Sequence, residues 1–78
     1  MVELTKEEFQ ILWFIEEGNG IPEGMVSLSE FSLEDIKHTL LFLEKHGLIE
    51  IRKDSDFWQA TTTMKAKDIY AQYEHWIP

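Results

Sequence analysis

The side chains best suited to acid–base or metal chemistry are three histidines, His38, His46 and His75, and fifteen acidic residues. Glu34 and His38 are four residues apart and would share one face of a helix, but no third ligand is spaced to complete a metal site with them. His46 is expected at a helix C-terminus, where the helix dipole favours a cation. The sequence has no cysteine, which excludes thiolate metal sites. Because no nucleophile–base pair can be argued either, we expect a binding protein without metal or other cofactor, not an enzyme.

Charge is the most pronounced bulk property of these 78 residues. The formal net charge is −8, which opposes non-specific attraction to nucleic acid and to anionic membranes. Residues 52–67 are the only basic zone, where four cations outnumber two acids. The longest apolar run, residues 11–15, is far too short to span a bilayer, and no signal-peptide pattern precedes it. We expect one small domain over residues 1–78, cytoplasmic and without membrane contact.

The elements that must position these charges are best specified in residues 32–51. Ser32 is a good N-cap, because its hydroxyl can accept a hydrogen bond from an amide of the first turn. Gly47 is placed to end the helix in a left-handed conformation, and the apolar residues after it favour a strand. The three- and four-residue spacing predicts one buried stripe on this helix, made of Leu33, Ile36, Leu40 and Leu43.

Another helix is predicted from Thr5 to about Glu17. Thr5 and Glu8 are spaced as a capping box, and Gly18 follows the last turn. The helix carries more apolar residues than one stripe needs, namely Phe9, Ile11, Leu12, Trp13, Phe14 and Ile15. It is therefore either central to the domain or covered in part by a partner chain.

The segment between these two helices is predicted to be mostly irregular. Residues 18–24 contain three glycines and a proline, which disfavour helix and strand. Ser27 and Glu30 are spaced as a further capping box. Because Ser32 caps the next helix almost at once, the middle helix has room for only about one turn, of α or 3₁₀ type.

Two strands and a last helix complete the prediction. The strands are expected over residues 48–52 and 57–62, joined by a polar tip as a β-hairpin. The last helix is expected to run from its cap at Thr63 to His75. Its apolar stripe is made of Ala66, Ile69, Tyr70 and Tyr73, extended by Trp76.

This order of elements resembles the winged-helix fold of small prokaryotic regulators. Two local patterns carry the resemblance, Ile36-x3-Leu40-x2-Leu43-Glu44-x2-Gly47-Leu48-Ile49 and Thr63-x-Lys65-Ala66-x3-Tyr70. The first is similar to a recognition helix that runs into the first wing strand. The second is similar to a Thr-x-Lys-Gly segment after the second wing strand, with Ala66 in place of glycine. The expected fold is α+β and mainly helical: helix, loop, one-turn helix, recognition-type helix, β-hairpin wing and C-terminal helix.

The resemblance implies a DNA-binding transcriptional regulator. On the outward face of the recognition-type helix, Lys37, His38 and Lys45 are the candidates for groove contact. Two acids, Glu34 and Asp35, stand at the end expected deepest in the groove, where phosphates would repel them. Contact is therefore expected mainly through the wing, whose candidate residues are Arg52 and Lys53, with Lys65 nearby.

The alternative is an acidic winged-helix module that binds a protein partner or a second copy of itself and does not bind DNA. Leu41 and Phe42 lie outside the main stripe, so they either complete a broad core face or form an apolar patch for a partner. Strand alternation turns one of Phe57 and Trp58 away from the core. Trp58 could stack on a base, anchor a protein partner, or cover the edge of the core.

Overall fold

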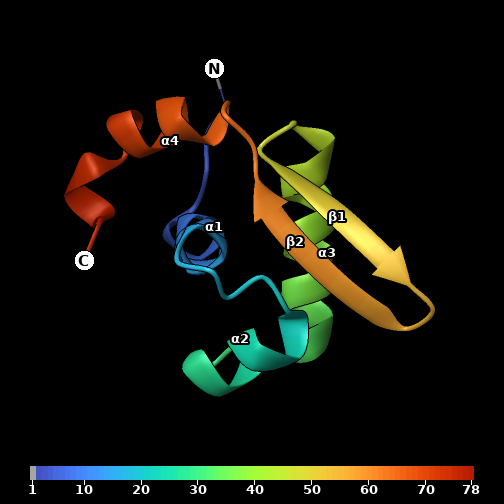
Figure 1. Ribbon diagram of the computed structural model, residues 1–78. Coiled ribbons are helices and arrows are strands. Elements are labelled where there is room, and N and C mark those ends of the chain that lie inside the picture. The colour runs from blue at the N-terminus through green and yellow to red at the C-terminus, as the bar shows by residue number, and fades with distance from the viewer. Residues whose placement is uncertain (1) are drawn as a thin grey trace.

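The computed structural model describes residues 2–78, and its elements run along the chain in the predicted order (Figure 1). The helices are α1 (Lys6–Glu16), α2 (Pro22–Leu28), α3 (Leu33–Lys45) and α4 (Ala66–Gln72), followed by one 3₁₀ turn, η1 (Glu74–Trp76). An antiparallel hairpin of β1 (Ile49–Asp54) and β2 (Phe57–Thr62) separates α3 from α4. The α+β class is confirmed. Within the described residues, no helix is both long and apolar enough to cross a membrane.

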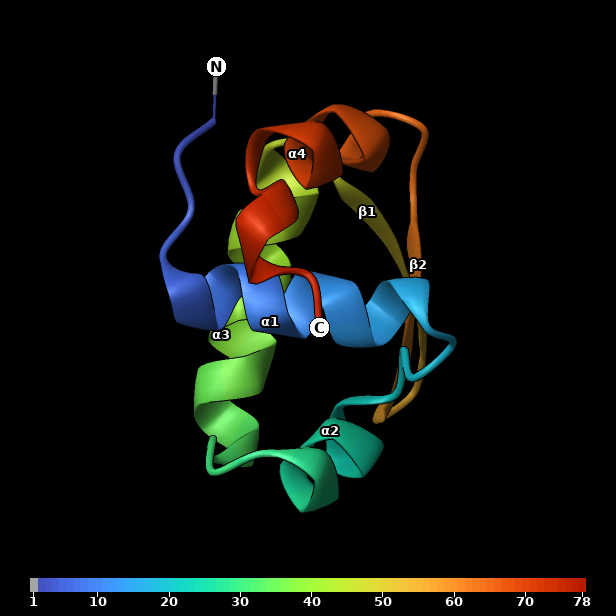
Figure 2. The same ribbon diagram turned by 90° about the vertical axis from the view of Figure 1, so that its left-hand side faces the viewer.

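Helix α1 crosses α3 steeply and forms the centre of the domain (Figures 1 and 2). It packs against α3 on one side and against β2 on another, while α2 packs at the N-terminal part of α3. The four buried residues of α1 are Phe9, Ile11, Leu12 and Ile15. Trp13 and Phe14 are half-buried against the same core. The surplus of apolar residues in this helix is thus largely explained by its central place.

The stripe on α3 is confirmed at three of its four positions. Ile36, Leu40 and Leu43 are fully buried. Leu33 is 36% exposed, so the prediction that it belongs to the buried stripe is wrong. Leu33 is the first residue of α3 and lies at the edge of the surface that α3 buries. The spacing of apolar residues predicts the direction of a side chain, but it does not predict how far the buried surface extends along the helix.

Both long helices begin and end as their sequences predict. Thr5 and Glu8 form a reciprocal capping box, and the Ser32 hydroxyl accepts the Asp35 amide at 3.1 Å. Gly18 and Gly47 have positive φ angles of 95° and 76°. After each glycine the chain makes the paired 5→2 and 6→1 hydrogen bonds of a Schellman motif, as in the Gly47 amide to Glu44 (3.0 Å) and the Leu48 amide to Leu43 (3.1 Å).

Helix α2 corrects the prediction for residues 18–24. It begins at Pro22 and has seven residues, so it is longer than one turn and starts inside the expected loop. Proline is well suited to the first helical position, because its fixed φ fits and its missing N–H has no partner there. Ser27 does not cap this helix; it lies within it, and its hydroxyl donates to the Gly24 carbonyl at 2.8 Å. The helix ends at Leu28, and the hydroxyl of the next residue, Ser29, donates to the Met25 carbonyl at 2.8 Å.

The start of the last helix is also corrected. Thr63 does not cap α4, which begins at Ala66 and ends at Gln72, before the expected His75. The Thr63 hydroxyl donates to the Gly47 carbonyl at 2.6 Å, and its amide donates to the Leu48 carbonyl at 3.0 Å. These bonds tie the exit of the hairpin to its entrance. A threonine with a distant acceptor is unavailable for the local capping bond that sequence spacing suggests.

Gly20 connects the segment after α1 to the hairpin. Its carbonyl accepts the Ala60 amide at 2.8 Å, and a Cβ built on it would overlap the Ala60 carbonyl oxygen. Gly24 differs, because a Cβ there meets nothing within 4 Å. The close approach of the Ala60 backbone therefore requires glycine at position 20, whereas no steric contact requires it at position 24.

We predict opposite effects of alanine at these two positions. Gly20→Ala should lower the free energy of unfolding by about 2 kcal/mol or more, because the strand and the loop must separate. Gly24→Ala should raise it by about 0.5–1 kcal/mol, since alanine is the better helix former and the space is open. Urea unfolding followed by circular dichroism measures both. Equal effects of the two substitutions would contradict the contact at Gly20.

Tyr70 of α4 brings a phenol hydroxyl into the protein interior. The hydroxyl is enclosed and makes no hydrogen bond of acceptable geometry, although the Glu16 carboxylate and Thr62 lie nearby. Burial, and secondly the neighbouring Glu16 carboxylate, raise the pKa of Tyr70 well above its ordinary value of 10.0. The protonated phenol is therefore favoured in the folded state. The stability that the folded state gains by keeping this phenol protonated is complete below pH 10.0, and it is lost as the pH rises above that value because the phenol then ionises in the unfolded chain.

We predict that Tyr70→Phe raises the free energy of unfolding at neutral pH by about 1 kcal/mol, because it removes a buried hydroxyl without a partner. The variant should also lose less stability than the wild type above pH 10.0. Tyr73→Phe is the control with the opposite sign. The Tyr73 hydroxyl accepts the Leu4 amide at 2.9 Å, so its removal should cost about 1 kcal/mol. Urea unfolding at neutral and alkaline pH would refute the assignment if Tyr70→Phe were the destabilising change.

Candidate nucleic-acid and partner interface

Trp58 stands between two lysines where α3 meets the hairpin. The Lys37 ammonium, from α3, lies 5.0 Å from the centroid of the indole ring. The Lys53 ammonium, from β1, lies 4.6 Å from it. Lys53 and Trp58 are direct cross-strand partners, which explains their contact. Both cations lie within the range of a cation–π interaction, so the half-buried indole holds two positive charges together at one place.

The hairpin separates the two predicted wing cations. Successive residues of a strand point to opposite faces, and β1 alternates accordingly. Lys53 shares a face with Ile51 and with the buried Ile49, toward the core. Arg52 points to the other face, between Glu50 and Asp54. Arg52 and Lys53 therefore cannot act as one basic patch, and Arg52 lies in an alternating row of acid, base and acid.

The outward line of α3 is only weakly basic. Glu34, His38, Leu41 and Lys45 recur at four- and three-residue spacing, so they share one face of the helix, and all four are exposed. Lys37 lies on the flank of this line that faces the hairpin, where it meets Trp58. The face that would enter a major groove thus presents one lysine, one histidine, one leucine and one glutamate.

Lys65 lies at the far end of α3 from Lys37. Its side chain covers Gly47, where its Cδ lies 3.6 Å from the position of a Cβ built on that glycine. Helix α3 has 13 residues and is therefore about 20 Å long. Of the six predicted nucleic-acid residues, the structure brings together Lys37 and Lys53. His38 and Lys45 share the neighbouring helix face, and Arg52 and Lys65 lie elsewhere.

The four predicted partner residues do not form one patch either. Phe42 is half-buried against the core, and its ring meets His46 edge-to-face at 4.6 Å. Leu41 is 44% exposed on the outward line of α3. Phe57 is 49% exposed on the outer face of the hairpin, whereas Trp58 is half-buried. The prediction that one of Phe57 and Trp58 points away from the core is confirmed.

Negative charge is concentrated in the N-terminal part of the chain. Residues 1–32, which include α1 and α2, contain seven acids and one base, a net charge of −6. Residues 33–62, which form α3 and the hairpin, contain six acids and four bases, a net charge of −2. Residues 63–78 are neutral, with two of each. Of the net charge of −8, the elements that form the junction therefore carry −2.

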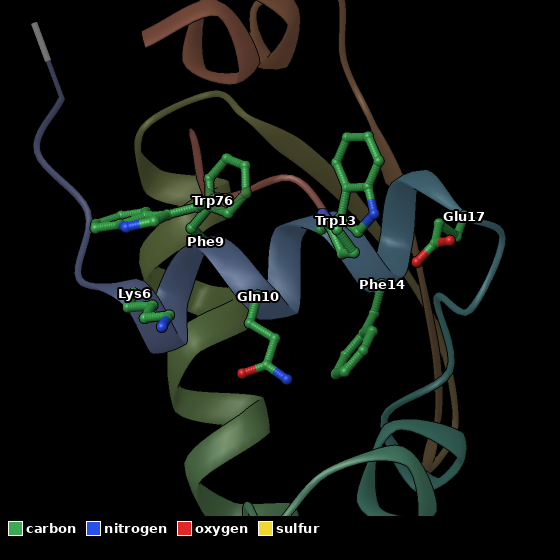
Figure 3. Close-up of a pocket in the computed structure, with 8 residues that line it drawn as sticks. Lys6, Phe9, Gln10, Trp13, Phe14, Glu17 and Trp76 are labelled. Atoms are coloured by element: carbon green, nitrogen blue, oxygen red, sulfur yellow. The ribbon is translucent and has the colours of Figure 1, made fainter. Parts of the chain in front are cut away.

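The structure also contains a surface hollow that the sequence did not predict. It has a volume of about 450 Å³ and lies along the outward face of α1, bordered by Trp76 (Figure 3). Its other lining residues are Lys6, Phe9, Gln10, Trp13, Phe14, Glu17 and Pro78. The spacing of Lys6, Gln10, Trp13 and Glu17 on one helix face was a signal available in the sequence.

In comparisons with protein-family models, with curated proteins and with solved structures, no match to this chain was found. The assignment of a function therefore depends on the geometry of the chain itself.

We predict a measurable coupling between Lys37 and Trp58. Lys37→Met should lower the free energy of unfolding by about 0.5 kcal/mol in the wild type and have no such effect in a Trp58→Leu background, because the ring that it contacts is gone. Lys45→Met is the matched control on the same helix, and its effect should be the same in both backgrounds. Urea unfolding of the wild type and the three variants in each cycle measures the coupling. A coupling of zero for Lys37 would contradict the contact.

Proposed function

We propose that this chain is a small winged-helix regulatory module that binds duplex DNA mainly through its hairpin. The observation that carries the proposal is the pair of lysines, Lys37 and Lys53, held on Trp58 at the place where the recognition-type helix meets the wing. In winged-helix proteins this junction lies against the duplex. Two fixed cations there would contact backbone phosphates, and the indole edge between them would lie close to the sugar–phosphate backbone.

Three features of the backbone support the winged-helix assignment. Helix α2 has two turns rather than one, so α2 and α3 can form a helix-turn-helix pair. The hairpin follows α3 directly after Gly47, as a wing follows a recognition helix. A hydrogen bond from the Ala60 amide to the Gly20 carbonyl joins the segment before α2 to β2. The assignment rests on fold-level analogy, and the function rests on the site.

The charges suggest how such a contact would work. The outward line of α3 contains Glu34 and Leu41, which neither bind phosphates nor supply the usual base contacts. The outward line of the helix would therefore contribute shape and one lysine, Lys45. With one lysine from the flank of α3 and one from the hairpin at the junction, the contact should be weak and steeply dependent on salt.

A second candidate function is protein binding without DNA binding. The favouring observation is Leu41, 44% exposed at the middle of the outward line of α3 with Glu34, His38 and Lys45 around it. An exposed leucine with a mixed charged rim is typical of a protein interface rather than of a DNA-reading helix. The net charge of −8 favours the same candidate.

The two candidates can be separated by a fluorescence-anisotropy titration with a labelled duplex at low salt. We expect binding whose affinity falls as salt rises. Lys37→Ala/Lys53→Ala should weaken it about tenfold or more, and should reduce the slope of log K against log salt by about 2, one phosphate contact per lysine. Lys65→Ala/Lys67→Ala removes the same charge at another place and is the matched control, with a much smaller expected loss.

Two results would count against the proposal. No binding at high micromolar protein in low salt would exclude DNA as the target and leave protein binding. An equal loss in Lys65→Ala/Lys67→Ala would show that the general charge, and not the junction at Trp58, controls the affinity.

A further inference from the structure

Within residues 2–78, the outer edge of β1 has no neighbouring strand. The sheet consists of β1 and β2 alone, and β2 is the strand that packs on α1, so β1 is the outer one (Figure 1). The other edge of β2 is partly covered, because the Ala60 amide donates to the Gly20 carbonyl. That hydrogen bond also shows that the backbone groups of Ala60 point away from β1.

The backbone groups at the free edge of β1 belong to Ile49, Ile51 and Lys53. Ile51 is the cross-strand partner of Ala60, so its own amide and carbonyl point away from β2. Ile49 and Lys53, two residues to either side, point the same way. None of these amides and carbonyls has a hydrogen-bond partner among residues 2–78. The edge therefore offers a continuous row of donors and acceptors.

This edge lacks the features that usually prevent strand pairing. β1 has six residues, contains neither proline nor glycine, and pairs with β2 without a bulge. A lysine on an edge strand often blocks a new neighbour. The Lys53 ammonium, however, lies 4.6 Å from the indole centroid of Trp58 on β2, so this side chain is turned away from the free edge. A further strand can therefore add to β1.

The side chains on the outer face of β1 select the strand that can be added. They alternate acid, base and acid along Glu50, Arg52 and Asp54, and all three are exposed. A second β1 can pair antiparallel so that Ile51 lies opposite Ile51 of the partner subunit. Glu50 then lies opposite Arg52 of the partner subunit on both sides of the axis. These are non-hydrogen-bonded pairs, in which opposed side chains lie closest.

The neighbouring registers bring like charges together. With Arg52 opposite Arg52 of the partner subunit, Glu50 meets Asp54 of the partner subunit, so every opposed pair on the outer face is repulsive. With Glu50 opposite Glu50 of the partner subunit, the acids meet and Arg52 faces an apolar residue. A shift of one residue would bring the edge groups opposite groups that point toward β2. Charge therefore favours the register centred on Ile51.

We propose that two copies of this chain dimerise by antiparallel pairing of their β1 strands about a two-fold axis at Ile51, which forms one four-stranded sheet. The two Ile51 residues exchange hydrogen bonds with each other. Ile49 of each copy exchanges hydrogen bonds with Lys53 of the partner subunit, so every free amide and carbonyl of the edge gains a partner. The contact is isologous, so it closes after two copies and does not propagate.

Helix α3 gives this contact a second layer. α3 packs on β1, and the axis is perpendicular to the joined sheet, so both α3 helices lie on the same face of it. Lys37 contacts Trp58 near the tip of the hairpin, and α3 ends near its base. Leu41, one turn after Lys37, is therefore level with the middle of β1. It is 44% exposed, and the axis brings it toward Leu41 of the partner subunit, where both become covered.

The size of the contact sets the expected strength. One strand pair with a leucine contact beneath it lies at the small end of specific interfaces, so we expect a dissociation constant on the order of tens of micromolar. The inference does not rest on DNA binding, because it uses the backbone of the edge and not the lysine side chains at the junction. It gives the second candidate function, protein binding at Leu41, a defined partner.

Sedimentation velocity over a range of protein concentrations tests the register through charge reversal. The wild type should dimerise. Glu50→Arg alone and Arg52→Glu alone should each weaken the dimer about tenfold or more, since two attractive pairs become repulsive. An equimolar mixture of the two variants should restore a dimer between unlike chains. Within the hairpin these positions are exposed and lie opposite the neutral Thr61 and Gln59, so the fold should tolerate both changes.

The control variants change the net charge equally at other places. Glu17→Lys matches Glu50→Arg, and Lys67→Glu matches Arg52→Glu. Both controls should leave the dissociation constant within about twofold of the wild-type value, because neither position lies on β1 or α3.

Amide hydrogen exchange identifies the edge itself. At concentrations where the protein is dimeric, the Ile51 and Lys53 amides should exchange about tenfold or more slowly than in the dilute monomer. The Arg52 amide points to β2 and should be protected in both states. Lys53→Pro removes an amide that makes no bond within the chain, so it should abolish the dimer while the circular dichroism of the folded chain persists.

Three results would overturn the proposal. A wild type that stays monomeric at several hundred micromolar excludes the dimer. A dimer whose Ile51 amide exchanges as fast as in the monomer excludes the strand edge as its contact. Charge-reversed variants whose mixture stays monomeric exclude the register. None of these results bears on DNA binding, which the anisotropy titration tests separately.

Discussion

The packing of other elements around α1 is the interaction on which the rest of this structure depends. Leu12 is completely buried, and Phe9 has the rings of Trp13, Tyr70, Tyr73 and Trp76 within 6.4 Å of its own. The α3 stripe closes one side of the helix and β2 another. The hydrogen bond from the Leu4 amide to the Tyr73 hydroxyl ties the segment before α1 to the end of the chain. The buried side chains of residues 2–78 form one cluster, and α3 and β2, which pack directly on α1, connect α2 and β1 to it.

The elements that the sequence predicts well are those set by local chemistry. The caps at Thr5 and Ser32 and the glycine stops at Gly18 and Gly47 need only neighbouring residues, and all four are found. Helix α2 was predicted too short and too late, because Pro22 is a helix breaker at most positions but suits the first position of a helix. The cap at Thr63 was wrong for another reason: its hydroxyl is bound to Gly47, sixteen residues earlier, and local spacing carries no information about that bond.

The candidate sites likewise combine features that neighbouring residues determine with features that only the fold determines. That one of Phe57 and Trp58 faces outward follows from strand alternation, and so does the separation of Arg52 from Lys53. The meeting of Lys37 with Trp58 joins a helix to a strand across the fold, which no periodicity in the sequence contains. The concentration of acids in α1 and α2 could be counted from the sequence, but its meaning required knowing that these helices lie apart from the tip of the hairpin (Figure 1). Composition gave the total charge, and the fold distributes it.

The two hydrogen bonds of Thr63 have a mechanical consequence for the hairpin. They close residues 47–63 into a ring at the base of the hairpin. The loss of chain entropy on closing this ring is therefore incurred at the base, far from the two-residue tip at Ser55 and Asp56. The exits of α3 and β2 therefore stay fixed relative to each other, and Lys37 of α3 meets Trp58 near the other end of the hairpin. The hairpin is thus held to α3 at its base and near its tip, so a surface that binds the hairpin also meets the helix.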